Sequence, residues 1–138
     1  MMLSGSCLCG AVRYRIAGPL KMAGHCHCSI CRKAHGAAFA TWTMVRTDQF
    51  QWIAGEEYLR AYSSSPDRQR LFCGECGTPI AATHNGHIGE VVLASLDDEP
   101  GVRPREHIFV GSRACWHEIT DALPQFVQWP PGLEPATA

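Results

Sequence analysis

The sequence predicts a small, mainly β single domain with many short strands and one or two short helices, and three observations favour that class. Runs rich in aromatic and β-branched residues are short and are divided by glycine, proline and asparagine turns. One run alternates apolar and polar residues with the period of a strand. Helix-capping signals are few, and the length of 138 residues is typical of one domain.

The clearest strand signal lies at residues 11–17, where apolar and polar side chains alternate until Gly18 and Pro19 end the run. A half-buried strand shows this period, because successive side chains point to opposite faces of a sheet. Composition predicts further strands at 37–45, 50–53, 57–62, 80–84, 87–93 and 106–110.

Two turns are expected between these strands. Residues 63–67 gather three serines, a proline and an aspartate, all of which favour turns. Asn85 and Gly86 stand between the runs at 80–84 and 87–93, and this dipeptide suits a type I′ turn, whose central residues need positive φ. The two runs are therefore expected to pair as a hairpin.

Helical signals occur in two places. Ser29 is a candidate N-cap for a short helix over 30–35, with Gly36 as its left-handed stop. A second short helix is expected near 114–122. Residues 129–138 are rich in proline and small residues and are expected to form a loose tail, which leaves 1–128 as the domain.

The composition is that of an ordinary soluble domain, with 46% apolar residues, 18% charged residues and a net charge of −1. This near-neutral charge excludes a broad field that recruits nucleic acid or acidic membranes. No apolar run approaches the ~18–20 residues that cross a bilayer. The first residues lack the basic-then-apolar order of a signal peptide, so a cytoplasmic location is expected.

The cysteines are the most informative feature of the sequence. Seven of the 8 cysteines fall in three tight groups. In a reducing compartment disulfides are rare, and clustered cysteines more often bind metal or act in catalysis. The groups are Cys7 with Cys9, then Cys26, Cys28 and Cys31, and finally Cys73 with Cys76.

The first and third groups predict a closed structural zinc site. In an extended chain Cys7 and Cys9 point to the same face. The C-x-x-C turn converges the sulfurs of Cys73 and Cys76, and flanking glycines permit its tight backbone. Two such pairs supply four thiolates, which is the ligand set of a tetrahedral zinc with Zn–S near ~2.3 Å.

The middle group predicts a different zinc site, because it has three cysteines and no fourth nearby. Cys26 and Cys28 share one face of an extended segment, and Cys31 lies at the expected helix start. Three protein ligands and an open fourth position are the arrangement of a catalytic zinc. The alternative is closure by a histidine. Neighbouring histidines lie on the opposite strand face or farther along the helix, at His25, His27 and His35.

Other conspicuous residues are expected to have structural roles. Cys115 is expected to be a packed core thiol. Core positions are also expected for Trp42, Trp52 and Trp116. Solvated charges are expected at Arg68, Arg70 and Arg113, although any of them could hold a substrate carboxylate. Arg32 and Lys33, next to Cys31, are candidates for the same role.

Three motifs together resemble a known family. The runs GSCLCGAVRY (5–14), HCHCSICRK (25–33) and FCGECG (72–77) are similar to the three cysteine motifs of the glutathione-dependent formaldehyde-activating enzyme family, to which centromere protein V also belongs. The resemblance spans roughly residues 4–126, and the ordered seven-cysteine pattern is specific.

The resemblance implies a β-tent of folded-over antiparallel sheets and two zinc ions per chain. The structural zinc would bind Cys7, Cys9, Cys73 and Cys76, and the catalytic zinc would bind Cys26, Cys28 and Cys31. It also implies a carbon–sulfur lyase-type enzyme that adds a small thiol such as glutathione to a small aldehyde such as formaldehyde.

The alternative function is a non-enzymatic zinc module that binds a protein or nucleic acid. The sequence has no basic stripe and no interleaved aromatic and basic residues, so it favours small-molecule substrates over nucleic acid and membrane partners. An exchangeable ligand at the second zinc distinguishes the enzyme from the module. The oligomeric state stays open.

Overall fold

The computed structural model describes residues 1–134 and confirms a mainly β fold. Within that range the chain forms ten strands and one α-helix, linked in places by short 3-10 turns. The strands are β1 (Met2–Ser6), β2 (Arg13–Ala17), β3 (Ala23–Cys26), β4 (Ala40–Met44), β5 (Phe50–Ala54), β6 (Leu59–Ser65), β7 (Arg68–Cys73), β8 (Pro79–His84), β9 (His87–Val92) and β10 (Pro104–Ile108), and the helix is α1 (Ser29–His35).

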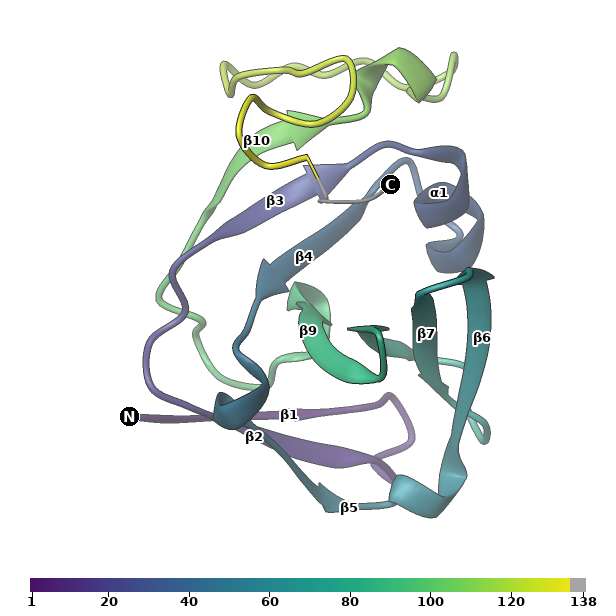
Figure 1. Cartoon of the computed structure of the whole chain (residues 1–138), viewed down its shortest axis with the longest axis vertical. Helices are drawn as coiled ribbons and strands as arrows, with labels where there is room; N and C mark the ends of the chain where they lie inside the picture. The colour runs from purple at the N-terminus through teal and green to yellow at the C-terminus, as the bar shows by residue number, and fades with distance from the viewer. Residues whose placement is uncertain (135–138) are drawn as a thin grey trace.

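The strands form two sheets. The three-stranded sheet has the order β1-β2-β5 and lies at the bottom of Figure 1. The seven-stranded sheet has the order β10-β3-β4-β9-β8-β7-β6, with β10 and β3 at the top of that view. Neighbouring strands are antiparallel, as the resemblance implied, except that β10 runs parallel to β3. A parallel pair cannot be joined by a tight turn, and here most of the chain lies between the two strands.

The predicted N-terminal strand forms β2, and its alternating pattern builds part of the core. Tyr14 and Ile16 are buried, whereas Arg13 and Arg15 are exposed. The Tyr14 ring lies over Gly5 of β1, where a Cβ would come within 2.1 Å of it, so only glycine fits. β1 itself carries little strand signal, because serine and glycine have low strand propensity.

Helix α1 ends where the sequence predicts, but its N-cap differs from the prediction. Cys28 rather than Ser29 is the N-cap, and its Sγ accepts a hydrogen bond from the Cys31 backbone N–H at 3.3 Å. Gly36 ends the helix at φ 59°, in the left-handed region. Within residues 1–134 no helix has the length and apolarity needed to cross a membrane.

The hairpin of β8 and β9 confirms the predicted type I′ turn. Asn85 has φ 51° and Gly86 has φ 83°, so both central residues are left-handed. The strands flanking this turn pair at His84 and His87. The turn predicted over 63–67 is shorter than expected, because β6 continues to Ser65.

The predictions for the C-terminal third need correction. Residues 114–122 do not form a helix. Asp121 instead uses its carboxylate to accept hydrogen bonds from the backbone N–H of Leu123 and from the His107 ring, and such side-chain bonds compete with helix formation. The last strand also ends earlier than predicted, because Phe109 adopts φ 56° directly after β10.

The segment expected as a tail begins with ordered contacts. Trp129 packs edge-on against Phe109, with ring centroids 5.2 Å apart, and Pro130 is buried. Residues 135–138 of that segment lie outside the described residues.

Two groups of buried side chains form the core. The larger one lies between the sheets and includes Tyr14, Ile16 and Ile80. The smaller one surrounds the middle cysteine group and consists of Cys26, Cys31, Ala40, Trp42, Ala82 and Val92. Trp42 is therefore a core residue, as predicted. The predicted core positions of Cys115 and Trp116 are wrong, because both are exposed in the irregular segment after β10.

Candidate metal centres

The four-cysteine group forms where the two sheets meet. Cys7 and Cys9 lie in the turn after β1, Cys73 is the last residue of β7, and Cys76 lies in the turn between β7 and β8. All four sulfurs lie within 4.8 Å of one another. The chain thus brings together two cysteine pairs from different sheets, which the sequence motifs had only suggested.

Each cysteine pair is held by a tight turn that directs backbone N–H groups at sulfur. In the first turn the Gly10 N–H donates to the Cys7 carbonyl at 3.0 Å, and the Val12 N–H donates to Cys7 Sγ at 3.2 Å. Cys7 and Cys9 therefore converge through a turn and not through the expected strand, since β1 ends at Ser6.

The second turn repeats this arrangement. The Gly77 N–H donates to the Cys73 carbonyl at 2.8 Å, and the Glu75 N–H donates to Cys73 Sγ at 3.4 Å. Gly77 has φ 82°, so the predicted need for glycine here is confirmed. N–H groups aimed at sulfur stabilise thiolates, which are the ligand form of cysteine.

Thr78 joins the two turns and was not singled out by the sequence. Its Oγ1 accepts a hydrogen bond from the Leu8 N–H at 3.0 Å and lies 3.2 Å from Cys76 Sγ. The Thr78 hydroxyl and backbone lower the pKa of Cys76 to about 5. A hydroxyl residue directly after C-x-x-C-G is the signal that could have identified it.

The four-sulfur geometry fits a tetrahedral metal. Sulfurs around a zinc at ~2.3 Å lie about 3.8 Å apart. The distance between Cys7 Sγ and Cys9 Sγ is 3.6 Å, and that between Cys9 Sγ and Cys73 Sγ is 3.9 Å. The Ala11 N–H favours the Cys9 thiolate, but the crowded Cys7 sulfur and its neighbours raise the pKa of Cys9 to about 12. A divalent cation would relieve that crowding of negative charge.

The three-cysteine group is built by the end of β3 and the first turn of α1. Cys26 is the last residue of β3, Cys28 is the N-cap of α1, and Cys31 lies in its first turn. The three sulfurs lie within 4.8 Å of one another, and Cys26 and Cys31 are buried. This donor set also fits a thiophilic metal.

The histidines near this group have other partners. His25 Nδ1 lies 2.8 Å from Thr41 Oγ1, and His35 packs edge-on against Trp42 with centroids 5.2 Å apart. His27 is fully buried, and its Nε2 lies 2.8 Å from His107 Nδ1. In the described part of the chain, no histidine nitrogen joins the three sulfurs.

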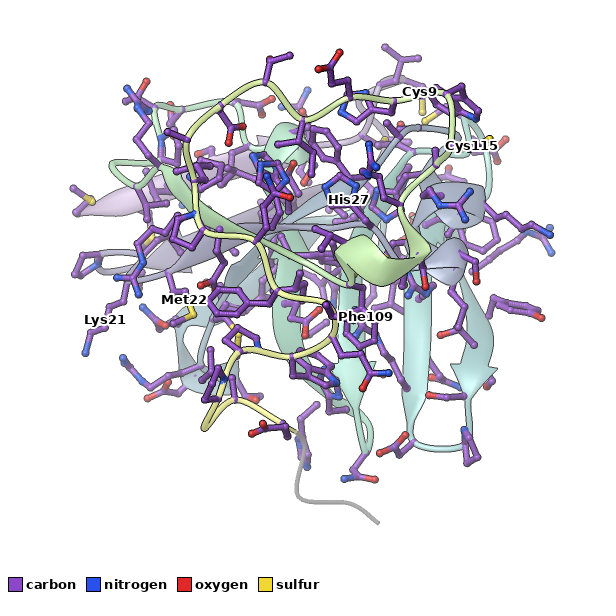
Figure 2. All side chains as sticks on the ribbon, turned by 90° about the horizontal axis from the view of Figure 1, so that it is seen from above. Cys9, Lys21, Met22, His27, Phe109 and Cys115 are labelled. Atoms are coloured by element: carbon purple, nitrogen blue, oxygen red, sulfur yellow. The ribbon has the colours of Figure 1, made fainter. Side chains whose placement is uncertain are left out.

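His27 and His107 form a buried chain that ends at a carboxylate. His107 Nε2 lies 3.0 Å from Asp121 Oδ2, and His107 is only 2% exposed. Burial, reinforced by the charge of His107, lowers the pKa of His25 and of His27 to about 4, so both rings are neutral at pH 7. Figure 2 shows His27 in the interior of the view, in contrast to Lys21, which projects at the periphery.

Arg70 is not the solvated charge that the sequence predicted. It is 9% exposed, and its Nη2 donates to Cys31 Sγ at 3.5 Å. Hydrogen bonds from Cys26 and Cys28, together with the Arg70 charge, hold the pKa of Cys31 far below its ordinary range despite burial. Strand alternation before Cys73 places Arg68 and Arg70 on one face, and this was the available signal.

Arg68 is only partly buried, and it has a carboxylate partner. Its Nη2 lies 2.6 Å from Glu90 Oε2, and the two side chains are 16% and 12% exposed. Burial raises the pKa of Glu90, but the hydrogen bond from His84 and the Arg68 charge lower it overall. Arg113, by contrast, is exposed, as predicted.

A cleft of about 620 Å³ touches the surroundings of both cysteine groups. Cys7 and Thr78 of the four-cysteine group line it, as do Ala40 and Val92, which pack with the three-cysteine group, but Cys26, Cys28 and Cys31 themselves do not. The lining of the cleft also includes Leu8, His35, Thr41 and Asp97. Neither Arg32 nor Lys33 lines it, so the cleft does not use the carboxylate-binding candidates from the sequence. Arg32 instead donates from Nε to the His27 carbonyl at 3.3 Å.

Comparisons with known proteins identify the relatives of this chain. The family described as glutathione-dependent formaldehyde-activating enzyme matches residues 2–112. A Halomonas elongata protein, provisionally named as an enzyme of this kind, is 31% identical over an alignment 129 residues long that covers 86% of this chain and 82% of that protein. An uncharacterised lyase of Schizosaccharomyces pombe is 28% identical over 76 residues, which are 55% of this chain and 53% of that protein. The crystal structure of a Rhodobacter sphaeroides protein has a TM-score of 0.54 and 29% identity, covering 74% of this chain and 92% of that one.

Proposed function

The chain belongs to the glutathione-dependent formaldehyde-activating enzyme family, and from that membership we propose that it is a zinc-dependent enzyme of the carbon–sulfur lyase type. Its reaction is the addition of a small thiol, such as glutathione, to a small aldehyde, such as formaldehyde. The centre of the reaction is the group of Cys26, Cys28 and Cys31.

One observation carries this proposal, namely the difference between the two sulfur groups. The four-cysteine group supplies a full tetrahedral set, whereas the other group supplies three sulfurs and no histidine. We therefore assign zinc at Cys7, Cys9, Cys73 and Cys76 to structure. Zinc at the three-cysteine group would have a position for an exchangeable ligand.

The proposed reaction needs a thiolate and no redox partner. Bound zinc would hold the sulfur of the substrate thiol as a thiolate and thereby make it nucleophilic at neutral pH. The S–C bond forms at the aldehyde carbon, the π bond of the carbonyl opens, and the proton lost by the thiol ends on the new hydroxyl. The apolar neighbours Ala40, Trp42 and Val92 keep water away from the buried sulfurs.

The cleft beside this group is the proposed approach for the thiol. The support for this approach is that Ala40 and Val92 line the cleft and also pack with Cys26 and Cys31, although the three sulfurs lie behind that lining and Cys7 of the four-cysteine group also faces the cleft. The reduced, clustered cysteines suit a reducing compartment, so we infer a cytoplasmic enzyme.

The test uses exchange at equilibrium, because thiols and formaldehyde also react without an enzyme. Magnetisation-transfer NMR measures the exchange between free glutathione and its hydroxymethyl adduct in the presence of zinc-loaded protein. We expect faster exchange with the wild type and only the background rate with Cys28→Ser. The matched control is Cys115→Ser, since Cys115 is exposed and lies in neither group.

A second measurement separates the enzyme from a zinc-binding module. Cobalt is exchanged into both centres, and its visible spectrum is followed while glutathione is added. A spectral change confined to the three-cysteine centre supports an exchangeable position there. Background exchange with the wild type, together with an unchanging spectrum, would reject the enzyme in favour of the module.

A further inference from the structure

Arg70 is a buried cation whose position the proposed chemistry has not yet used. Its Nη2 donates to Cys31 Sγ at 3.5 Å, and its Nε donates to Ser64 Oγ at 3.1 Å. Its Nη1 is buried and has no hydrogen-bond partner among the described residues. Two hydrogen bonds thus fix the guanidinium, and its Nη1 remains an unused hydrogen-bond donor.

Arg70 and Arg68 share the ring of Trp42 but differ in how their charge is balanced. The guanidinium carbons of Arg68 and Arg70 lie 5.1 Å and 5.7 Å from the Trp42 ring centroid. Arg68 is paired with Glu90 at 2.6 Å. No ion pair joins Arg70 to a carboxylate within residues 1–134, so its nearest negative partner is the Cys31 sulfur.

The charge of a loaded three-cysteine centre explains why a buried cation lies there. Three thiolates and one divalent metal ion leave one net negative charge in a largely buried group. A buried charge is costly unless it is paired. A thiolate as fourth ligand would add a second negative charge, so a fixed cation beside one sulfur becomes more important when substrate binds.

We propose that Arg70 is the positioning residue of the three-cysteine centre. It fixes the Cys31 sulfur and compensates the negative charge of the loaded centre, so that an anionic fourth ligand can be accepted. The first part depends only on metal binding, whereas the statement about the fourth ligand rests on the proposed function. Arg70 acts on the centre through the Cys31 sulfur, and the Ser64 hydroxyl holds the Arg70 guanidinium in place.

The primary test is zinc affinity, measured by competition with a coloured chelator. Outer partners of metal ligands typically change affinity by about 10–100-fold when mutated. Zinc is released to the chelator in two steps, one for each centre. We expect Arg70→Gln to weaken zinc binding at the three-cysteine centre by that factor and to leave zinc binding at the four-cysteine centre unchanged. The Cys28→Ser variant identifies which release step belongs to the three-cysteine centre.

The matched control is Arg68→Gln, because Arg68 contacts the same Trp42 ring but is neutralised by Glu90. For Arg68→Gln we expect the zinc affinity of the three-cysteine centre to change by much less than about tenfold, which is the smallest change expected for Arg70→Gln. Arg70→Lys keeps the charge but cannot hold Ser64 and Cys31 with one planar fork, so we expect an affinity between those of the wild type and Arg70→Gln.

A spectroscopic readout separates this role from general support of the fold. With cobalt in the centre, loss of a positively charged N–H donor raises the energy of the sulfur electrons. The sulfur-to-cobalt charge-transfer band should therefore move to longer wavelength in Arg70→Gln and move back toward the wild type in Arg70→Lys. Ser64→Ala removes only the hydrogen bond that holds Arg70 Nε. It should therefore move the band to longer wavelength, as Arg70→Gln does, but by less.

The outcomes are distinct from those of the proposed function. Unchanged zinc affinity and an unchanged band in folded Arg70→Gln would overturn this inference, even if the wild type catalyses thiol addition. If Arg70→Gln does not fold, the same two measurements on Ser64→Ala and Arg70→Lys decide, and wild-type behaviour of both variants overturns it. The expected shifts in a protein without thiol-addition activity would support the role of Arg70 and reject the enzyme.

Discussion

At the scale of single residues, one hydroxyl connects the two halves of the four-cysteine group. Thr78 Oγ1 accepts from the Leu8 N–H and lies within hydrogen-bond distance of Cys76 Sγ. A hydroxyl can accept and donate at once, so it can receive the Leu8 N–H while it donates to a Cys76 thiolate. The two turns are thereby held in register before any metal contributes.

We expect Thr78→Val to weaken this group without altering its shape, because valine has nearly the same volume and no hydroxyl. Each lost hydrogen bond should lower the free energy of unfolding by about 0.5–1.5 kcal/mol, or more where a thiolate is the partner. Chelator competition should show weaker zinc binding at the four-cysteine step alone.

Thr47→Val is the matched control, since the Thr47 hydroxyl donates to the Ile88 carbonyl on an exposed part of the surface. We expect no change in zinc binding there. Equal zinc affinities for Thr78→Val and the wild type would show that Thr78 has no part in the site.

At the scale of elements, α1 positions two of the three cysteines of the second group. Its N-cap is Cys28 and its first turn contains Cys31, so the start of the helix fixes the distance between those sulfurs. Its last turn ends at Gly36, whose backbone N–H donates to the Arg32 carbonyl. The helix has seven residues, and so short a helix depends on its caps and on packing.

We expect Gly36→Ala to destabilise the protein by about 1–2 kcal/mol, because an L-residue with a Cβ is strained at φ 59°. No atom lies within 4 Å of the position that the Cβ would take, so the cost is conformational and not steric. Urea unfolding of the zinc-loaded protein measures it.

Gly24→Ala in β3 is the control, because Gly24 has ordinary φ and its nearest neighbours to a new Cβ lie at 3.6 Å. It should change the free energy of unfolding less than Gly36→Ala does. The reverse order would contradict the role assigned to the left-handed cap.

At the scale of the whole molecule, the four-cysteine group links the two sheets. One pair follows β1 of the three-stranded sheet, and the other pair lies at the end of β7 and in the turn to β8 of the seven-stranded sheet. The three-cysteine group is local by comparison, since it joins only β3 to the adjoining α1. The two groups should therefore contribute very differently to stability, because binding at a structural site is part of the folding free energy.

We expect Cys73→Ser to lower the melting temperature of the zinc-loaded protein by at least about 10 °C, and Cys28→Ser by only a few degrees. Serine is itself a preferred N-cap, so Cys28→Ser keeps the start of α1 intact. Calorimetry measures both values, and elemental analysis should find two zinc ions in the wild type and one in Cys28→Ser. Equal losses of melting temperature would contradict the division of roles.

The sequence by itself determined the features that depend on neighbours along the chain. The alternation at 11–17, the Asn85 and Gly86 turn, and the Gly36 stop all follow from local backbone geometry and were confirmed. The two cysteine pairs and the group of three were likewise visible, because short spacings converge sulfurs locally, whereas the meeting of the two pairs was only suggested. The same kind of local pattern failed over 114–122, where no helix forms and Asp121 bonds to His107 and Leu123 instead.

Only the tertiary structure decided which distant segments meet. It paired β10 with β3 in parallel, placed Thr78 between the two cysteine turns, and buried Arg70 against Cys31. Thr78 and Arg70 look like ordinary polar residues in the sequence, and Arg70 lies 39 positions from Cys31. Contacts across such separations depend on the pairing of strands and the packing of both sheets, and local propensity contains no information about either.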